Sequence, residues 1–330
     1  MPTAFVTGAT GFVGVNLVSA LTARGWEVVA LHRPRSNLSY LSRFKPTLRV
    51  GTVEDESSLR AAIPDGVDAV FHTAASVSWW RPAAEAQHRI NVIGTRNVAR
   101  AALARRARRM IHTSSIAAFG LLAGEITEET QSSAERSPIG YLRTKYLAEL
   151  EVRAAIEAGL DAVILNPANI VGPYDLLNWS RSFRLVAEGR LPGIPPGGGA
   201  FCHVERVVEA HIASVERGRT GERYILAGVN ASYLEMFTAI GRLLGRSVPR
   251  KTVPPLLLQI VARLFDWRSR LTGREPDVTP DLVTALCARY SCSSAKAERE
   301  LGYDGAQSLE GMLADCHAWM VREGMLPARG

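Results

Sequence analysis

The amino-acid sequence predicts an α/β protein, with a doubly wound parallel β-sheet first and a smaller, mostly helical lobe towards the C-terminus. Three observations support this prediction. Up to Asn166, short runs of residues that favour strands alternate with helical patterns, as in parallel strands joined by helices. A turn with Gly8, Gly11 and Gly14 separates the first run from the first helical pattern. After Pro167 the alternation stops, so a second lobe is expected there.

The patterns place the elements in chain order. Strands are expected over residues 3–7, 27–31, 48–50, 69–72, 110–113 and 162–165, and helices over 11–24, 57–63, 85–105 and 138–158. Proline and glycine in 190–199 predict a loop between lobes. A strand over 222–226 is expected to return to the sheet, with helices over 256–271 and 308–322 in the smaller lobe. The sequence predicts two structural units. The sheet domain consists of residues 1–166, and about 204–227 return to it. The substrate lobe consists of residues 167–203 and 228–330.

Composition and charge argue against several other classes of protein. Of the 330 residues, 47% are hydrophobic and 22% charged, as in ordinary globular proteins. The net charge of +7 comes from scattered basic residues, and the one dense cluster, at 105–109, ends a predicted helix without interleaved aromatics. No nucleic-acid partner is therefore expected. The four cysteines lack metal-ligand spacing, so no metal is expected.

The apolar segments do not predict membrane insertion. The longest, 253–265, contains two prolines and an arginine, so it is not expected to insert stably in a bilayer. The first predicted strand begins at residue 3, which leaves no room for a signal peptide. A cytoplasmic protein is therefore expected.

The glycine-rich turn is expected to hold the phosphates of a dinucleotide. Its residues follow the spacing GxxGxxG between a strand and a helix, which is the context that this fingerprint requires. Gly8 allows the tight turn, Gly11 lets the backbone approach a pyrophosphate, and Gly14 permits close helix packing. The first amides of the helix then face the phosphates.

Tyr141 and Lys145 form a candidate proton-transfer pair. They stand four residues apart, so they share one face of a predicted helix. Ser137 and Pro138 precede them and are expected to begin that helix as its N-cap and first turn. A neighbouring ammonium favours the phenolate, so we expect Lys145 to lower the tyrosine pKa toward neutrality, where proton transfer is effective.

Together, the GxxGxxG turn, the segment Tyr141-Leu142-Arg143-Thr144-Lys145 and the segment Asn91-Val92-Ile93-Gly94-Thr95 resemble the extended short-chain dehydrogenase/reductase family. Segments 271–276 and 295–303 look like its branch with dihydroflavonol reductases and 3β-hydroxysteroid dehydrogenases. The resemblance implies a Rossmann fold, a nicotinamide cofactor and catalysis by Ser115, Tyr141 and Lys145, with Ser114 as the alternative to Ser115.

The resemblance also implies which residues surround the cofactor. Asn91 is expected to orient the cofactor side of the site, and a contact with neighbouring backbone is the open alternative. Besides Gly8, Gly11, Tyr141 and Lys145, the expected cofactor residues are Thr7, Thr10, Phe12, Val13, Arg33, Arg35, Thr52, Val53, Thr73, Ala74, Ala75, Asn91, Thr113, Pro167, Ala168 and Ile170.

The end of the second predicted strand favours NADP(H) over NAD(H). NAD-binding folds of this type commonly place an acidic residue about 20 residues after the glycines, on the ribose hydroxyl. Here the strand is followed by Arg33 and Arg35, without a carboxylate, and guanidinium groups suit the additional phosphate of NADP(H). NAD(H) stays open. Thr52 stands where relatives usually have an aspartate, so adenine recognition is expected to rest on Val53 and backbone groups.

Substrate contacts are expected just beyond the strand ends. Segment 167–173 resembles the family's crossing into the substrate lobe, with Asn166 in place of the usual arginine. The tryptophans at 79 and 80 follow the fourth strand and are expected to form an apolar pocket with two further aromatics, or else to pack between lobes. The expected substrate residues are Val77, Trp80, Ser115, Phe119, Asn169 and Tyr174.

The predicted function is an NADP(H)-dependent oxidoreductase that reduces an apolar ketone or aldehyde, or runs the reverse reaction, with Tyr141 as proton donor or acceptor. The first alternative is an NAD-dependent nucleotide-sugar epimerase or dehydratase, and the second a non-catalytic NADP(H)-sensing protein. The expected partner is a small-molecule substrate. The sequence does not decide between a monomer and a homodimer. Helix 256–271 has a broad apolar face with basic edges, and whether it is core, a lid or a membrane contact is open.

Overall fold

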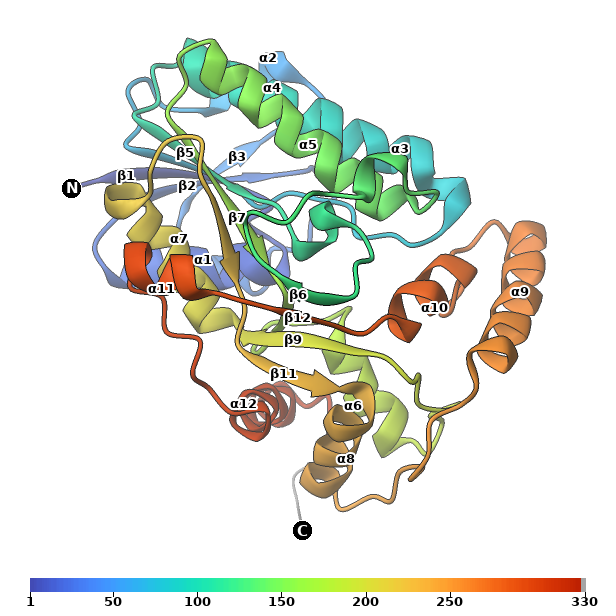
Figure 1. Ribbon diagram of the computed structural model, residues 1–330. Helices are drawn as coiled ribbons and strands as arrows, with labels where there is room; N and C mark the ends of the chain where they lie inside the picture. The colour runs from blue at the N-terminus through green and yellow to red at the C-terminus, as the bar shows by residue number, and fades with distance from the viewer. Residues whose placement is uncertain (328–330) are drawn as a thin grey trace.

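A computed structural model describes residues 1–327 and shows a parallel sheet with helices on both faces (Figure 1). The seven strands have the order β10-β7-β5-β4-β1-β2-β3, and neighbouring strands are parallel. Their bounds are β1 Thr3–Thr7, β2 Glu27–His32, β3 Thr47–Val50, β4 Ala69–His72, β5 Arg109–Thr113, β7 Ala162–Pro167 and β10 Arg223–Leu226. This is the Rossmann order extended by further strands, so the predicted fold class is confirmed.

Alternation along the strands divides the sheet core into two layers. Ala4 and Val6 pack in the cluster that includes the first helix, whereas Phe5 between them packs in the cluster on the other face, as successive strand residues must. The first layer contains α1 (Phe12–Ala23), α7 (Val204–Arg217) and α11 (Ala295–Leu301). The second contains α2 (Glu56–Ala62), α4 (Gly94–Ala104) and α5 (Gly140–Glu157).

Two predicted helices differ in detail. The helix expected over 138–158 begins at Gly140, because Ile139 at its N-cap has extended backbone angles. The Ser137 hydroxyl accepts a hydrogen bond from the Ile139 amide at 3.2 Å, so it caps a turn before the helix. The helix expected over 85–105 is α3 (Ala84–His88), a π-helical turn (Arg89–Ile93) and α4. Asn91 lies in that π turn, a feature often found at functional sites.

The second part of the chain surrounds a small sheet of order β11-β9-β8, with bounds β8 Asn169–Val171, β9 Gly198–His203 and β11 Val229–Ser232. Its core is shared with α6 (Trp179–Ala187), α8 (Tyr233–Leu244) and α12 (Leu309–Arg322). The loop expected over 190–199 ends two residues early, because Gly198 and Gly199 are strand residues. A Cβ on Gly198 would lie 2.6 Å from the Ala231 carbonyl oxygen, so this glycine serves close strand packing.

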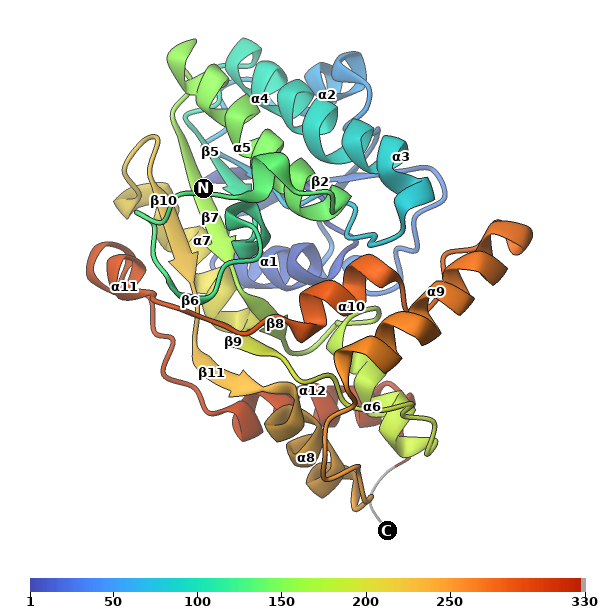
Figure 2. The same cartoon turned by 45° about the vertical axis from the view of Figure 1, so that its right-hand side comes forward.

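Two peripheral features complete the fold. Strand β6 (Gly124–Ile126) pairs with β12 (Tyr290–Cys292). Helices α9 (Pro255–Thr272) and α10 (Pro280–Cys287) pack together at the edge of the molecule (Figure 2). Among residues 1–327, no helix combines the length and the apolar character needed to cross a bilayer.

Candidate active site

The glycine-rich turn joins β1 to α1 next to the end of β4, where the strand order reverses. Gly8 has φ of 68°, and a Cβ there would lie 2.6 Å from the Ala74 amide nitrogen. A Cβ on Gly14 would overlap the Gly8 carbonyl oxygen. Both glycines are therefore required for the turn to pack against α1 and the β4 end. Open sheets bind ligands at this switch point, beyond the carboxyl ends of the strands.

The N-terminus of α1 has the form of a phosphate site. The Gly11 amide donates to the Gly8 carbonyl at 2.8 Å and so closes the turn. No side chain within residues 1–327 caps the first turn of α1, so its leading amides, from Phe12 and Val13, are available to an anion. Helix N-termini bind phosphates in this way. The turn therefore fits the pyrophosphate of a dinucleotide.

Buried hydrogen bonds fix the end of β4 beside this turn. The Thr73 hydroxyl donates to the Thr7 carbonyl at 2.8 Å. His72 lies between the hydroxyls of Thr7 at 2.7 Å and Thr95 at 3.0 Å. Burial lowers the pKa of His72 to about 3, so this histidine is a neutral linker. The expected cofactor residues Ala74 and Ala75 follow directly and provide a small-residue edge.

The residues expected to select the cofactor lie at the ends of β2 and β3. Arg33 and Arg35 are exposed directly after β2, and no acidic group of the described chain forms an ion pair with either. Both guanidinium groups are thus available to an anionic ligand. Thr52 donates its amide to the Ser58 hydroxyl at 3.2 Å, and Val53 is buried.

Ser115 lies close enough to Tyr141 to lower the pKa of its phenol, and Ser114 is not part of this contact. The Ser115 hydroxyl oxygen accepts from the Ala117 amide at 3.2 Å. The Ser114 hydroxyl instead donates to the Glu149 carboxylate at 2.6 Å. Of the two candidate serines, Ser115 is therefore the one that faces the phenol.

Lys145 is buried one helical turn beyond Tyr141. Its ammonium donates to the Thr113 carbonyl at 3.0 Å. Burial lowers the Lys145 pKa to about 8, although the nearby Glu149 carboxylate raises it. Burial also raises the pKa of Tyr141 above its ordinary value, and the nearby Ser115 hydroxyl lowers it only in part. The expected lowering of the tyrosine pKa by Lys145 is thus wrong for these side chains, because the desolvation of the phenolate dominates the shift and Lys145 does not contribute to it.

Glu149 continues the same face of α5 and was missed in the sequence. Besides Ser114, it accepts from the Asn166 amide at 2.6 Å, and Arg223 lies 3.7 Å from its other oxygen. The Asn166 amide also donates to the Ser115 carbonyl at 3.0 Å. This network fixes the backbone that carries Ser115. The signal was present, since Tyr141, Lys145 and Glu149 recur every four residues.

Asn91 connects the β4 loop to α5. Its side-chain amide donates to the Ser76 carbonyl at 2.9 Å and to the Thr144 hydroxyl at 3.1 Å, and its carbonyl accepts from the Ser76 amide at 2.7 Å. Its contacts are therefore with neighbouring backbone and with α5, in agreement with the alternative considered from the sequence. Asn91 positions the loop that follows β4.

The aromatic residues expected in one pocket lie in three places. The Trp79 ring lies 4.9 Å from that of Tyr141. Phe119 is fully buried beneath the Arg223 guanidinium. Tyr174 has φ of 67°, a left-handed conformation that directs it to Tyr40, with ring centroids 5.4 Å apart. The grouping expected from the sequence is therefore not formed, and Trp79 is the aromatic at the phenol.

The other expected substrate residues differ in how far their side chains are open to a ligand. The Asn169 amide donates to the Ala200 carbonyl at 2.9 Å and to the Tyr290 hydroxyl at 3.2 Å. Trp80 is half-buried, and its ring nitrogen has no partner within the described chain. Val77, by contrast, is 46% exposed. Of these three, Val77 has the side chain most open to a ligand.

The loop that carries Trp79 is held by residues of the segment between α9 and α10. Glu275 accepts from the Ser78 hydroxyl at 2.8 Å and from the Trp79 amide at 3.2 Å. The Thr279 hydroxyl donates to the Trp79 carbonyl at 2.9 Å. These contacts span about 200 residues of sequence, so no local pattern could have indicated them.

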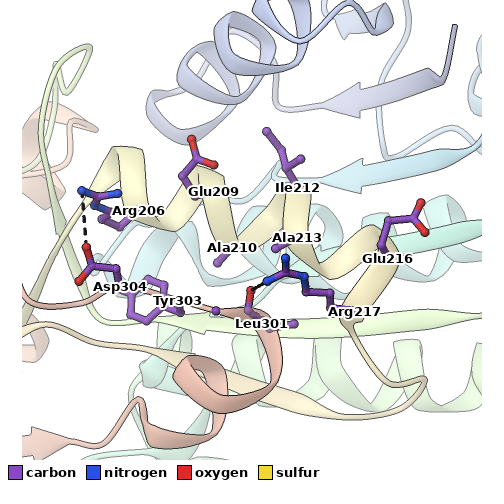
Figure 3. Close-up of a pocket in the computed structure, with 11 residues that line it drawn as sticks. Arg206, Glu209, Ala210, Ile212, Ala213, Glu216, Arg217, Leu301, Tyr303 and Asp304 are labelled. Carbon is purple, nitrogen blue, oxygen red and sulfur yellow. Dashed lines mark hydrogen bonds and ion pairs between the residues drawn. The ribbon is translucent and has the colours of Figure 1, made fainter.

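A cavity of about 380 Å³ adjoins this loop, with Trp79, Arg81, Gln259 and Thr279 in its lining. A larger cavity, of about 530 Å³, lies between α7 and α11, where Arg206 pairs with Asp304 (Figure 3). None of its lining residues belongs to the expected site. Within residues 1–327, no group of histidine, cysteine or acidic side chains is arranged to hold a metal ion.

Known proteins resemble this chain in sequence and in overall fold. Residues 4–227 match the model of the NAD dependent epimerase/dehydratase family. "Sterol demethylase protein B" of Methylococcus capsulatus is 33% identical over 98% of this chain and 100% of its own length. The "4-hydroxy-2-methyl-3-oxo-4-farnesyl-3,4-dihydroquinoline-1-oxide ketoreductase" of Stigmatella aurantiaca is 30% identical over 98% and 99%. The crystal structure of gox2253, 34% identical, superposes with a TM-score of 0.84 over 99% of this chain and 100% of that one. The chain therefore belongs to the NAD-dependent epimerase/dehydratase family and is an oxidoreductase of the extended short-chain dehydrogenase/reductase type.

Proposed function

We propose that the protein is an NADP(H)-dependent reductase of an apolar ketone or aldehyde, also able to run the reverse reaction, in which Tyr141 transfers the proton. The observation that carries this proposal is the placement of Ser115 beside Tyr141, with the buried Lys145 ammonium on the same helix face and the glycine turn at the same sheet edge. A bound nicotinamide supplies the hydride donor or acceptor.

The residues of the chain have separate tasks in this proposal. The first amides of α1 bind the pyrophosphate, and Gly8 and Gly14 let the turn pack closely against the end of β4 and against α1. Ser115 and Tyr141 bind the substrate oxygen, and the phenol gives that oxygen its proton during reduction. The Tyr141 phenol is protonated at neutral pH, as a proton donor must be. Lys145 supplies positive charge when the phenolate forms.

Two observations favour an apolar carbonyl compound as substrate. The Trp79 ring next to Tyr141 is an apolar surface. Asn169, which the sequence places among the substrate residues, instead donates to Ala200 and Tyr290. The names of the two relatives concern a sterol and a farnesylated quinoline oxide. These names are consistent with a lipophilic substrate for this chain.

A substrate panel distinguishes reduction from epimerisation, the alternative that the family's name keeps open. Ketones, aldehydes and nucleotide sugars are assayed with NADPH and NADH, with the consumption of reduced cofactor followed by absorbance and sugar isomers by chromatography. We expect consumption with apolar ketones or aldehydes. Interconversion of nucleotide sugars without net cofactor consumption would instead identify an epimerase.

Replacement of Arg33 and Arg35 by alanine is expected to weaken NADPH binding by roughly a hundredfold or more and leave NADH binding nearly unchanged, because each charged hydrogen bond contributes about 1.5–3 kcal/mol. Titration of tryptophan fluorescence with both cofactors measures the two affinities. Arg246→Ala, at another exposed arginine, is the control and should change neither. An equal loss for NADH would contradict the assignment of these arginines to the additional phosphate.

Replacement of Glu149 by glutamine is expected to shift the alkaline limb of the pH profile to lower pH. The carboxylate raises the pKa of Lys145, which is about 8, so the neutral glutamine lets this pKa fall. A cationic Lys145 is present below its pKa, and its contribution is lost as the pH rises through that value. The variant should therefore lose activity at lower pH than the wild type, as measured by kcat/KM for reduction against pH.

The matched control for Glu149→Gln is Glu151→Gln on the same helix. Glu151 forms an ion pair with Arg96 at 2.7 Å, so its replacement also removes a paired carboxylate, but away from Lys145. This control should retain the wild-type profile. A shift of the same size in both variants would show that Glu149 has no special effect on the lysine.

A further inference from the structure

Helix α9 presents its large apolar side chains to solvent. Its buried residues are Ala262 and Ser269, which are small. The apolar residues recur at spacings of three and four along one helix face. The usual arrangement of a surface helix, with its apolar face towards the core, is therefore reversed. The most exposed apolar side chains of α9, between 49% and 74% exposed, are Leu256, Leu257, Ile260, Leu264, Trp267 and Leu271.

Basic side chains border this apolar face on both sides. At about 100° per residue, Arg263 lies beside one border of the apolar face and Arg268 beside the other. Arg250, Lys251 and Arg274 lie close to the ends of the helix. Within residues 1–327, no acidic side chain forms an ion pair with any of these five residues. The helix is therefore apolar in the centre and cationic at its margins, with a tryptophan on its apolar face.

The position of α9 leaves this face open. In both views α10 lies between α9 and the rest of the molecule (Figures 1 and 2). The polar side of α9 faces that way, since Gln259 donates to the Pro280 carbonyl at 3.2 Å. The opposite side carries the exposed leucines and Trp267. An exposed apolar helix face bordered by basic side chains is typical of a helix that lies on the surface of a bilayer.

We propose that α9 docks on the surface of a bilayer that contains anionic phospholipids. Its leucines and Trp267 would enter the boundary between headgroups and acyl chains, where tryptophan is favoured. Arg263 and Arg268 would extend to the phosphate groups. Two copies of this chain that met through α9 would bring these unpaired cations together, and charge repulsion disfavours that contact. The docking surface is independent of the proposed reaction.

Docking would bring the candidate active site close to the bilayer. The chain leaves α9 at Gly273 and reaches Glu275 and Thr279, which hold the backbone of Trp79. Because the Trp79 ring contacts Tyr141, the docked helix and the phenol are joined through one short segment. A lipophilic compound dissolved in the bilayer would then have a short path to the site.

Vesicle flotation with the full-length protein tests the proposal. Phosphatidylcholine vesicles are compared with vesicles that also contain phosphatidylglycerol. We expect the wild type to float with the anionic vesicles and much less with the neutral ones. The double variant Leu264→Glu/Trp267→Glu should bind the anionic vesicles roughly tenfold less, because it replaces apolar contacts by charges that the lipid repels. Arg268→Gln should also weaken binding, and more at low salt than at high salt.

The matched control is Leu177→Glu, which changes a leucine that is 79% exposed outside α9 and should retain vesicle binding. Circular dichroism and thermal melting establish that all variants fold as the wild type does. Failure of the folded wild type to float, or an equal loss in Leu177→Glu, would overturn the proposal. A wild-type dimer in sedimentation that Leu264→Glu/Trp267→Glu dissociates, without vesicle binding, would identify α9 as a contact between copies and would also overturn it.

Discussion

Replacement of Tyr141 by phenylalanine is expected to reduce kcat for carbonyl reduction by about a thousandfold, within the range of loss of a general acid. The change removes one oxygen atom and retains the ring, so the packing against Trp79 should be preserved. Cofactor affinity should be unchanged, because the glycine turn is not altered. The measurement is steady-state kinetics with a substrate identified in the panel, together with fluorescence titration of NADPH.

The matched control for this variant is Tyr146→Phe. Tyr146 lies on the same helix, in the same apolar cluster as Tyr141, and the substitution removes the same atom. It should retain turnover close to that of the wild type. Unchanged turnover in Tyr141→Phe would refute the proposed role of the phenol, whereas an equal loss in both variants would indicate a general effect on α5.

Replacement of Gly8 by alanine is expected to reduce the affinity for NADPH by at least a hundredfold, about 2.7 kcal/mol. The new Cβ would lie 2.6 Å from the Ala74 amide nitrogen, against backbone that cannot easily move. The turn would have to shift, and with it the first amides of α1 that are assigned to the pyrophosphate. Fluorescence titration measures the affinity, and thermal unfolding measures the accompanying loss of stability.

Gly25→Ala separates the effect on the site from backbone strain. Gly25 has φ of 77°, close to the 68° of Gly8, but a Cβ there meets nothing within 4 Å. Both variants therefore introduce an alanine in a left-handed conformation, which costs about 1 kcal/mol. Only Gly8→Ala also introduces a clash at the site. If both variants lost cofactor affinity equally, the turn would not be the phosphate site.

Local sequence patterns were sufficient to predict the parallel sheet, the glycine turn between its first strand and the first helix, and the helix that carries Tyr141 and Lys145. Each strand of the large sheet except the edge strand β3 is a short run that is buried along at least half of its length, and the alternation of such runs with helices limits their possible order in space. The start of α5 was predicted too early, because the extended conformation of Ile139 outweighed the capping signal at Ser137.

Contacts between distant segments were beyond what a local pattern can indicate. Glu275 looks like an ordinary loop glutamate in the sequence, and only the fold brings it to Trp79. The spacing of Glu149 places it on the face of Tyr141 and Lys145, but only the fold brings it to Ser114. The direction of Tyr174 depends on its positive φ, which is uncommon for a residue other than glycine. The presence of Tyr174 close to the predicted site in the sequence was therefore not enough to predict that its ring lines a pocket there.

Because Glu275 and Thr279 hydrogen-bond to the Trp79 loop, one wall of the candidate active site is built from two segments about 200 residues apart in the sequence. The residues assigned to proton transfer belong to the sheet and α5, whereas the backbone of Trp79 is held by a segment that follows α9. Sequence change in that segment can move the wall and leave the proton-transfer residues in place. The fold thus separates the segment that holds the Trp79 loop from the residues assigned to proton transfer.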